Sequence, residues 1–199
     1  VENYPLYVVL GNVLFALMSD STTTAMYSII DSSSLIKKIR IEKLIFPIEK
    51  VLFQLVNFCI SLIAVAIVMV VMHVAPKLSL LALPLLLLYV VLFSAGVGMA
   101  LSAMAVFFRD VCHLWSVAIT AWTYATPLFY PVEILPEWAA PIMQFNPMYH
   151  YVTYFRDIVL QGVVPGLSEN LLCFGGALAT FAIGLFIFRK TEKKFILYV

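Results

Sequence analysis

Residues 126–162 read TPLFYPVEILPEWAAPIMQFNPMYHYVTYFRDIVLQG, and this stretch constrains the rest of the chain. It is apolar enough to lie at membrane depth, yet five of the ten prolines fall in it, at positions 127, 131, 136, 141 and 147. Each proline removes a backbone donor and blocks a helix interior, and Asn146-Pro147 adds a break because the residue before proline avoids the helical region. Broken backbone is tolerated in a bilayer only where protein buries it or it lines a water-filled path. The stretch predicts a pair of short re-entrant or interfacial helices closing one end of a pathway; the alternative is an extracytoplasmic loop resting on the bilayer.

The composition indicates an all-α polytopic membrane protein. Hydrophobic residues make up 63% of the 199 residues, only 12% are charged, and the mean hydropathy is +1.03, far outside the soluble range. The three cysteines, Cys59, Cys112 and Cys173, lie in or beside apolar runs without a CxxC motif. They are therefore interpreted as small core residues, not as a disulfide framework or a metal site.

Five apolar runs are predicted to span the membrane, since a crossing of about 30 Å needs about 20 helical residues. These spans are expected at about 6–30, 51–74, 78–108, 111–130 and 171–188. Residues 31–50 and 126–162 form the two largest connections.

The basic residues predict the orientation. Alternating spans leave Lys77 and Arg156 on one side and the other ten on the opposite side, which is then cytoplasmic. This arrangement puts the N-terminus outside, so we expect one further helix before residue 1 and six spans in the intact chain. The ten basic residues are Lys37, Lys38, Arg40, Lys43, Lys50, Arg109, Arg189, Lys190, Lys193 and Lys194.

Polar residues interrupt the first span at membrane depth. Asp20 is about 20 Å along the helix from Leu6, and an intramembrane carboxylate normally faces a bundle interior or a hydrated cavity. The helix either lines a hydrated conduit or packs closely through small polar residues. The candidate conduit-lining residues here are Asn12, Ser19, Asp20 and Thr23.

Small and polar residues on three other spans indicate helix packing. The second span carries Gln54, Asn57 and Ser61, whereas the third carries Ser94, Gly98 and Ser102 beside Gly96. Gly176, Thr180 and Gly184 recur on the last span. Such spacing lets helices approach closely.

Residues 31–50 are predicted to contain a short basic amphipathic helix, with N-caps offered by Ser32 to Ser34 and with Pro47 in the first turn of the next helix. It either lies on anionic lipid or docks into a groove of a soluble partner. Arg109 and Asp110 occupy a very short cytoplasmic turn, where we expect them to pair or to cap helix ends. Binding of a substrate phosphate by Arg109 is the alternative.

Trp115 and Trp122 share a face of the fourth span. Their large flat rings suit stacking against sugar rings or isoprenoid chains; the alternative is an interfacial aromatic belt with core packing. We therefore add both tryptophans to the candidate conduit-lining residues.

Several kinds of chemistry are missing from the sequence. It contains no GxxxxGK[ST], HExxH, GxSxG or paired-carboxylate motif, and its three histidines are isolated. We predict that the chain is not an enzyme, does not bind nucleic acid, and has no catalytic or metal site.

Four segments with spans between them carry a family resemblance: LIKKIRIEKLIFP, FFRDV, TPLFYPVEILPEW and FNPMYHYVTYFRDIVLQG. Together they resemble the membrane subunit of ABC-2 type exporters, in the branch that exports polysaccharide, O-antigen or teichoic acid. The resemblance covers essentially the whole chain. It departs at the N-terminus, where the amphipathic helix and the first span of the family are absent from this sequence.

The resemblance implies a multi-pass homodimer in the bacterial cytoplasmic membrane with its conduit at the subunit interface. Two ATPase subunits would hold the ATP and Mg, so this chain needs no cofactor. The cargo would be a glycan, such as a capsule or teichoic-acid polymer, carried by an isoprenoid (di)phosphate. Residues 31–50 become the coupling helix that docks on the ATPase, through Leu35, Lys37, Lys38, Arg40, Phe46 and Pro47.

On the same resemblance, residues 126–162 form the extracytoplasmic gate. Two other functions stay open: an ABC-2 permease for drugs or small lipids, and an ATPase-independent channel or carrier. The gate residues are Pro127, Phe129, Tyr130, Pro131, Pro136, Trp138, Asn146 and Pro147.

Overall fold

The computed structural model describes residues 3–39, 41–130 and 143–198, and all regular structure in these ranges is helical. The prediction of an all-α polytopic membrane protein is confirmed, because four of the described helical stretches are long and apolar enough to cross a membrane. The helices are α1 (Tyr4–Asp31), α2 (Ser33–Lys38), α3 (Ile45–Val71), η1 (Leu78–Ala82), α4 (Leu83–Phe107), α5 (Val111–Ala125), α7 (Pro147–Arg156), the π-helical turn η3 (Asp157–Gln161), α8 (Leu167–Thr191), η4 (Glu192–Lys194) and α9 (Phe195–Tyr198).

The helix α5 is shorter than the span predicted over 111–130. Its 15 residues cover only about 22 Å at 1.5 Å per residue, less than the roughly 30 Å of a bilayer core. The helix ends at Ala125 because Thr126 precedes Pro127 and takes an extended conformation, as residues before proline do.

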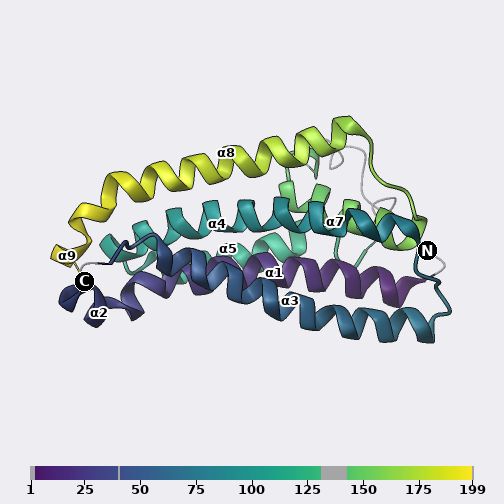
Figure 1. Cartoon of the computed structure of the whole chain (residues 1–199), viewed down its shortest axis with the longest axis horizontal. Coiled ribbons are helices and arrows are strands. Elements are labelled where there is room, and N and C mark those ends of the chain that lie inside the picture. Colours follow the sequence, from purple (N-terminus) through teal and green to yellow (C-terminus); the bar gives the residue numbers. More distant parts are fainter. Residues whose placement is uncertain (1–2, 40, 131–142, 199) are drawn as a thin grey trace.

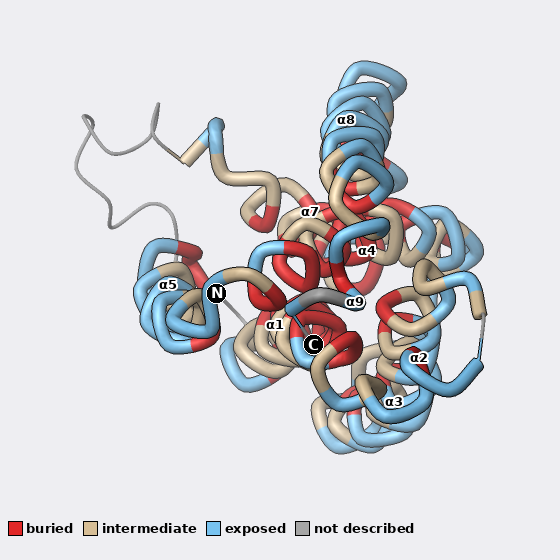
Figure 2. The backbone as a smooth tube through the Cα atoms, turned by 90° about the vertical axis from the view of Figure 1, so that its left-hand side faces the viewer, coloured by how far each residue is buried: buried red, intermediate tan, exposed pale blue. Residues whose placement is uncertain are grey.

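The helices α1 and α4 form the centre of the bundle, and α3, α5 and α8 surround them (Figure 2). Leu6, Leu10 and Leu14 of α1 and Leu86 of α4 are fully buried in one hydrophobic cluster. The outer face of α3 exposes Ile60, Ile63 and Ile67, as expected of a helix in contact with lipid.

Two glycines bring α4 and α8 into backbone contact. A Cβ atom on Gly96 would lie 2.5 Å from the Thr180 carbonyl carbon, and one on Gly184 would overlap the Gly96 carbonyl oxygen. The predicted packing through small residues is therefore confirmed at Gly96 and Gly184, whereas a Cβ on Gly176 would meet no atom within 4 Å.

The two ends of the bundle differ in charge. α2 and α9 lie at one end with the C-terminus, and the N-terminus lies at the other end, near α7 (Figure 1). Because successive long helices run in opposite directions, nine of the ten basic residues predicted to share a side lie at the first end, and Lys77 and Arg156 lie at the second. The tenth, Arg40, lies outside the described residues.

The pairing predicted between Arg109 and Asp110 is wrong. Both side chains are exposed in the turn between α4 and α5, and neither forms an ion pair within the described ranges. Asp110 occupies the N-cap position of α5, but its side chain makes no capping hydrogen bond. Water solvates both charges here, so a pair would gain little energy.

Candidate functional site

Asn146 joins the start of α7 to the end of α5. Its Oδ1 accepts hydrogen bonds from the Met148 amide at 3.0 Å and from the Trp122 indole Nε1 at 2.9 Å. Its Nδ2 donates to Thr126 Oγ1 at 3.0 Å. Asn146 is the N-cap of α7 and Pro147 is its first residue, a position that suits proline. The predicted break at Asn146-Pro147 is confirmed, and one side chain fixes how the two helices meet.

Arg156, at the end of α7, connects three segments that are distant in sequence. The side chain donates hydrogen bonds to the carbonyl oxygens of Tyr7 (3.2 Å), Pro127 (2.9 Å) and Leu128 (3.1 Å). Its guanidinium also stacks on the Tyr7 ring. Burial lowers the pKa of Arg156 to about 10, so the group remains charged at neutral pH. A buried charge is costly unless it is hydrogen-bonded, and here backbone carbonyls provide the bonds.

We call the segments joined in this way the cap: residues 126–130 together with α7. The carbonyl oxygens of Phe129 and Tyr130 accept hydrogen bonds from the hydroxyls of Tyr4 (2.7 Å) and Tyr7 (3.3 Å). The first turn of α1 therefore anchors both sides of the cap. Of the predicted gate residues, Pro131, Pro136 and Trp138 lie outside the described ranges, as does the first of the two short helices expected here.

A polar crevice of about 250 Å³ opens between α1 and α3. Asn12 and Asp20 line it from α1, facing three polar residues of α3. Asn57 Nδ2 donates to Gln54 Oε1 at 2.9 Å, and Ser61 Oγ donates to the Asn57 carbonyl at 3.0 Å. The polar faces predicted separately on the first two spans thus meet at membrane depth.

The other predicted conduit-lining residues do not reach this crevice. Ser19 and Thr23 are half-buried elsewhere on α1. On α5, the rings of Trp115 and Trp122 are 6.3 Å apart, and Trp122 also packs edge-on against Phe93 at 6.2 Å. These ring contacts and the hydrogen bond to Asn146 agree with core packing of Trp122. The Trp115 indole nitrogen is buried without a hydrogen-bond partner among the described residues.

The predicted coupling segment lies at the basic end of the bundle. Leu35, Lys37 and Lys38 of α2 are exposed, whereas Ile36 is buried in a cluster with residues of α1, α4 and α8. Phe46 packs against the same cluster, and Pro47 is buried in the first turn of α3. One face of α2 therefore anchors the segment and leaves Leu35, Lys37 and Lys38 accessible, whereas Phe46 and Pro47 contribute to packing and Arg40 lies outside the described residues.

Two contacts tie this segment to the end of α8. Lys43 Nζ donates to the Glu192 carbonyl at 2.6 Å, and Arg189 forms an ion pair with Glu42 at 2.9 Å. The segment is therefore in contact with the C-terminal end of α8 as well as continuous with α1 and α3.

Comparison with known proteins gives consistent results. A profile of the ABC-2 type transporter family matches residues 2–160. The chain is 26% identical over 196 residues to an O-antigen export system permease protein RfbA of Klebsiella pneumoniae, which covers 98% of this chain and 75% of the relative. An O-antigen export system permease protein RfbA of Myxococcus xanthus is 26% identical over 167 residues, or 83% of this chain and 64% of the relative.

Proposed function

The chain belongs to the ABC-2 type transporter family, and we propose that it is the membrane-spanning permease subunit of an ATP-driven exporter of a lipid-linked polysaccharide. The exporter would act in the bacterial cytoplasmic membrane, as a homodimer bound to two ATPase subunits. The cargo would be an O-antigen, or a related teichoic-acid or capsule polymer, carried on an isoprenoid (di)phosphate. Similarity to O-antigen export permeases along 98% of the chain supports this choice of cargo.

The observation that carries the proposal is the difference between the two ends of the bundle. One end exposes Leu35, Lys37 and Lys38 on a segment that is anchored through Ile36 and Glu42. This arrangement suits a surface that receives movement from an ATPase. At the opposite end lies the cap, which is attached to α1 through Arg156 and which would act as the gate.

In this mechanism, ATP binding on the partner favours one of two states of the permease. Movement of α2 passes along α1, whose first turn carries the cap. The polar crevice at Asn12 and Asp20 lies on the same helix, between the two ends. The wall of the conduit would thus shift together with the cap.

The decisive experiment is depletion of the protein in the organism that encodes it. Accumulation of lipid-linked glycan inside the cell, with loss of surface glycan, is expected. Normal surface glycan would overturn the proposal in favour of an ABC-2 permease for drugs or small lipids. Full export by the purified permease alone in liposomes, without ATP, would instead indicate an independent channel or carrier.

A further inference from the structure

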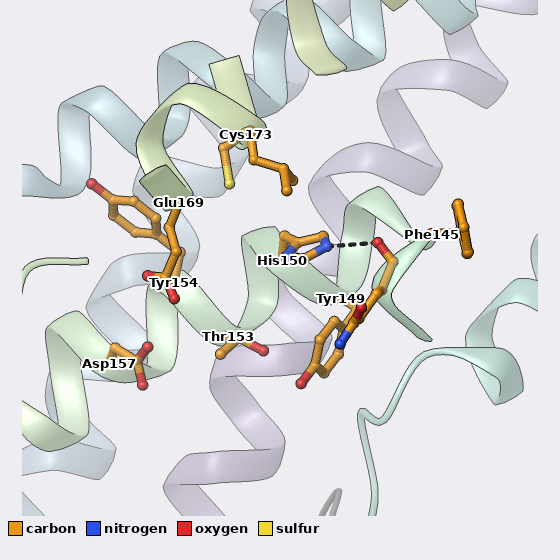
Figure 3. Close-up of a pocket in the computed structure, with 10 residues that line it drawn as sticks. Phe145, Tyr149, His150, Thr153, Tyr154, Asp157, Glu169 and Cys173 are labelled. Carbon is orange, nitrogen blue, oxygen red and sulfur yellow. Dashed lines mark hydrogen bonds between the residues drawn. The ribbon is translucent and has the colours of Figure 1, made fainter. Parts of the chain in front are cut away.

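A cavity of about 410 Å³ lies between α7, η3 and the start of α8, and neither the cap contacts nor the crevice uses it. Side chains of α7 and η3 face those of α8 across this space (Figure 3). Its volume is within the range of about 300–1,000 Å³ typical of small-molecule sites. It lies at the same end of the bundle as the cap.

The wall of the cavity combines ring faces with hydrogen-bonding groups. Phe145 lines the cavity and is 88% exposed. Tyr149 and His150 also line it, and the centroids of these two rings are 5.4 Å apart. The carboxylates of Asp157 and Glu169 complete the opposite side. A pyranose ring has apolar C–H faces and an edge of hydroxyl groups, so it needs this combination: a flat apolar surface and charge-assisted acceptors.

The local charge excludes phosphate. Asp157 and Glu169 make no ion pair among the described residues. Lys77 donates to the carbonyls of Leu160 and Gln161, and Arg156 is bound within the cap. Burial, followed by the negative charge of Glu169, raises the pKa of Asp157 to about 6. Among the described residues that line the cavity, an anionic group would meet two carboxylates and no lysine or arginine, so an isoprenoid phosphate or a phospholipid headgroup is disfavoured.

A second cavity of about 560 Å³ continues from the first along α8, past Leu172 and Gly176 to Thr180. Phe93, Ala179 and other apolar groups line it, so lipid chains suit this lower part. The two carboxylates line the first cavity and not the second, which shares Gln144 and His150 with it. The first cavity lies at the end of the bundle where a glycan would emerge into water.

We propose that the cavity between α7 and α8 is a saccharide-binding subsite that holds one or two neutral sugar residues of the emerging glycan. The assignment rests on the export function proposed above and adds a place where the exported chain is held outside the conduit. Phe145 and Tyr149 provide the stacking surface, and Asp157 and Glu169 accept hydrogen bonds from sugar hydroxyls.

Saturation-transfer difference NMR on the full-length permease in phosphatidylglycerol nanodiscs tests this proposal. The probe is a lipid-free oligosaccharide released by mild acid from the surface polysaccharide of the same strain. Wild-type protein should show saturable transfer to the probe. Phe145→Ala and Glu169→Gln should each weaken binding about tenfold, as expected for loss of a stacking face or a charge-assisted bond. Both side chains are exposed, so neither change should impair folding, which elution of the protein as a single species verifies.

Phe186→Ala is the matched control, because Phe186 is an exposed aromatic residue of α8 outside both cavities. It should leave binding unchanged. Absence of transfer to wild-type protein, or equal binding by all three variants, would overturn the subsite. Loss of binding in nanodiscs containing phosphatidylethanolamine would assign the cavity to an aminophospholipid instead. If surface glycan still depends on the protein when the NMR test fails, only the subsite is lost and the export function stands.

Discussion

The guanidinium carbon of Arg156 lies 3.4 Å from the centroid of the Tyr7 ring, across 149 residues of sequence. The contact joins the last turn of α7 to the first turns of α1, and it is one of several contacts that hold the cap.

Replacing Arg156 by methionine should destabilise the protein by about 3 kcal/mol, because three carbonyl groups lose their donor inside the protein. The measurement is the midpoint of thermal unfolding of the purified permease, followed by size-exclusion chromatography after heating. Lys77→Met is the matched control, since Lys77 donates to two carbonyls at an exposed position of the same end. Equal losses in the two variants would show that Arg156 is not the principal attachment.

Gly11→Ala should change the stability of the protein in opposite directions in the wild-type and Arg156→Met backgrounds. A Cβ at position 11 would lie 2.6 Å from the Arg156 Nη2, so alanine should destabilise the wild-type protein. In the Arg156→Met background the guanidinium is gone and the nearest remaining atom is Leu128 Cδ2, at 3.3 Å on a flexible side chain that can move aside. Alanine should then stabilise α1 by up to about 1 kcal/mol through its higher helix propensity. The thermal midpoints of the wild type, the two single variants and the double variant test this prediction. A change of the same sign in both backgrounds would contradict the close contact between position 11 and Arg156.

Asn146→Ala should cost about 2 kcal/mol, because it removes the helix cap and the bonds to Trp122 and Thr126. Trp122→Phe should cost less, since the ring packing against Phe93 is largely kept. The double variant should lose less stability than the sum of the two single-variant losses, because both substitutions remove the same hydrogen bond. Strict additivity in thermal unfolding would argue against this bond.

Reversing the charges of Lys37 and Lys38 to glutamate should reduce export while ATP hydrolysis and membrane insertion persist. The reason is that the exposed face of α2 would no longer fit its docking surface on the ATPase. Lys193→Glu with Lys194→Glu is the control, since it makes the same charge change at exposed positions of the same end. Equal export by the two double variants would instead favour the alternative that α2 lies on the lipid surface.

Stability should depend on pH through Asp157. Its pKa rises from an ordinary 3.8 to about 6 in the folded protein, because of burial and then the charge of Glu169. The folded state therefore holds this proton more tightly than the unfolded state. The contribution of Asp157 to stability is greatest below about pH 4, decreases as the pH rises to about 6, and is constant above.

Asp157→Asn should remove that decrease. The position is half-exposed, so solvent screening limits the expected difference to about 1 kcal/mol or less. Thermal midpoints of the two proteins at pH 5 and pH 7.5 provide the comparison. The prediction would be wrong if the wild-type protein gained stability relative to Asp157→Asn as the pH rises.

The sequence predicted the long helices and the break at Asn146-Pro147, since hydrophobic runs and proline act locally. It also placed polar residues on single helix faces, such as Asn57 on α3 and Asp20 on α1. It did not predict that those two faces meet, because the sequence pattern of one helix does not specify its neighbour.

The attachment through Arg156 was missed for the same reason. Its partners are backbone carbonyls, which every residue carries, so no pattern of side chains identifies them. A single arginine within the apolar, aromatic run YHYVTYFRD was the available signal. The Arg109–Asp110 pairing failed in the opposite way: adjacency in sequence supplied the charges, but exposure to water removed the reason for them to pair.

The glycine contact between α4 and α8 has a mechanical consequence. With the Gly96 and Gly184 backbones touching, neither helix can slide past the other by even the width of a methyl group without a collision. Close backbone packing of this kind favours joint movement of α4 and α8 in a conformational change. In contrast, α5 has Cys112 as the single buried residue of fifteen, so the packing of this chain constrains α5 far less than it constrains α4 and α8.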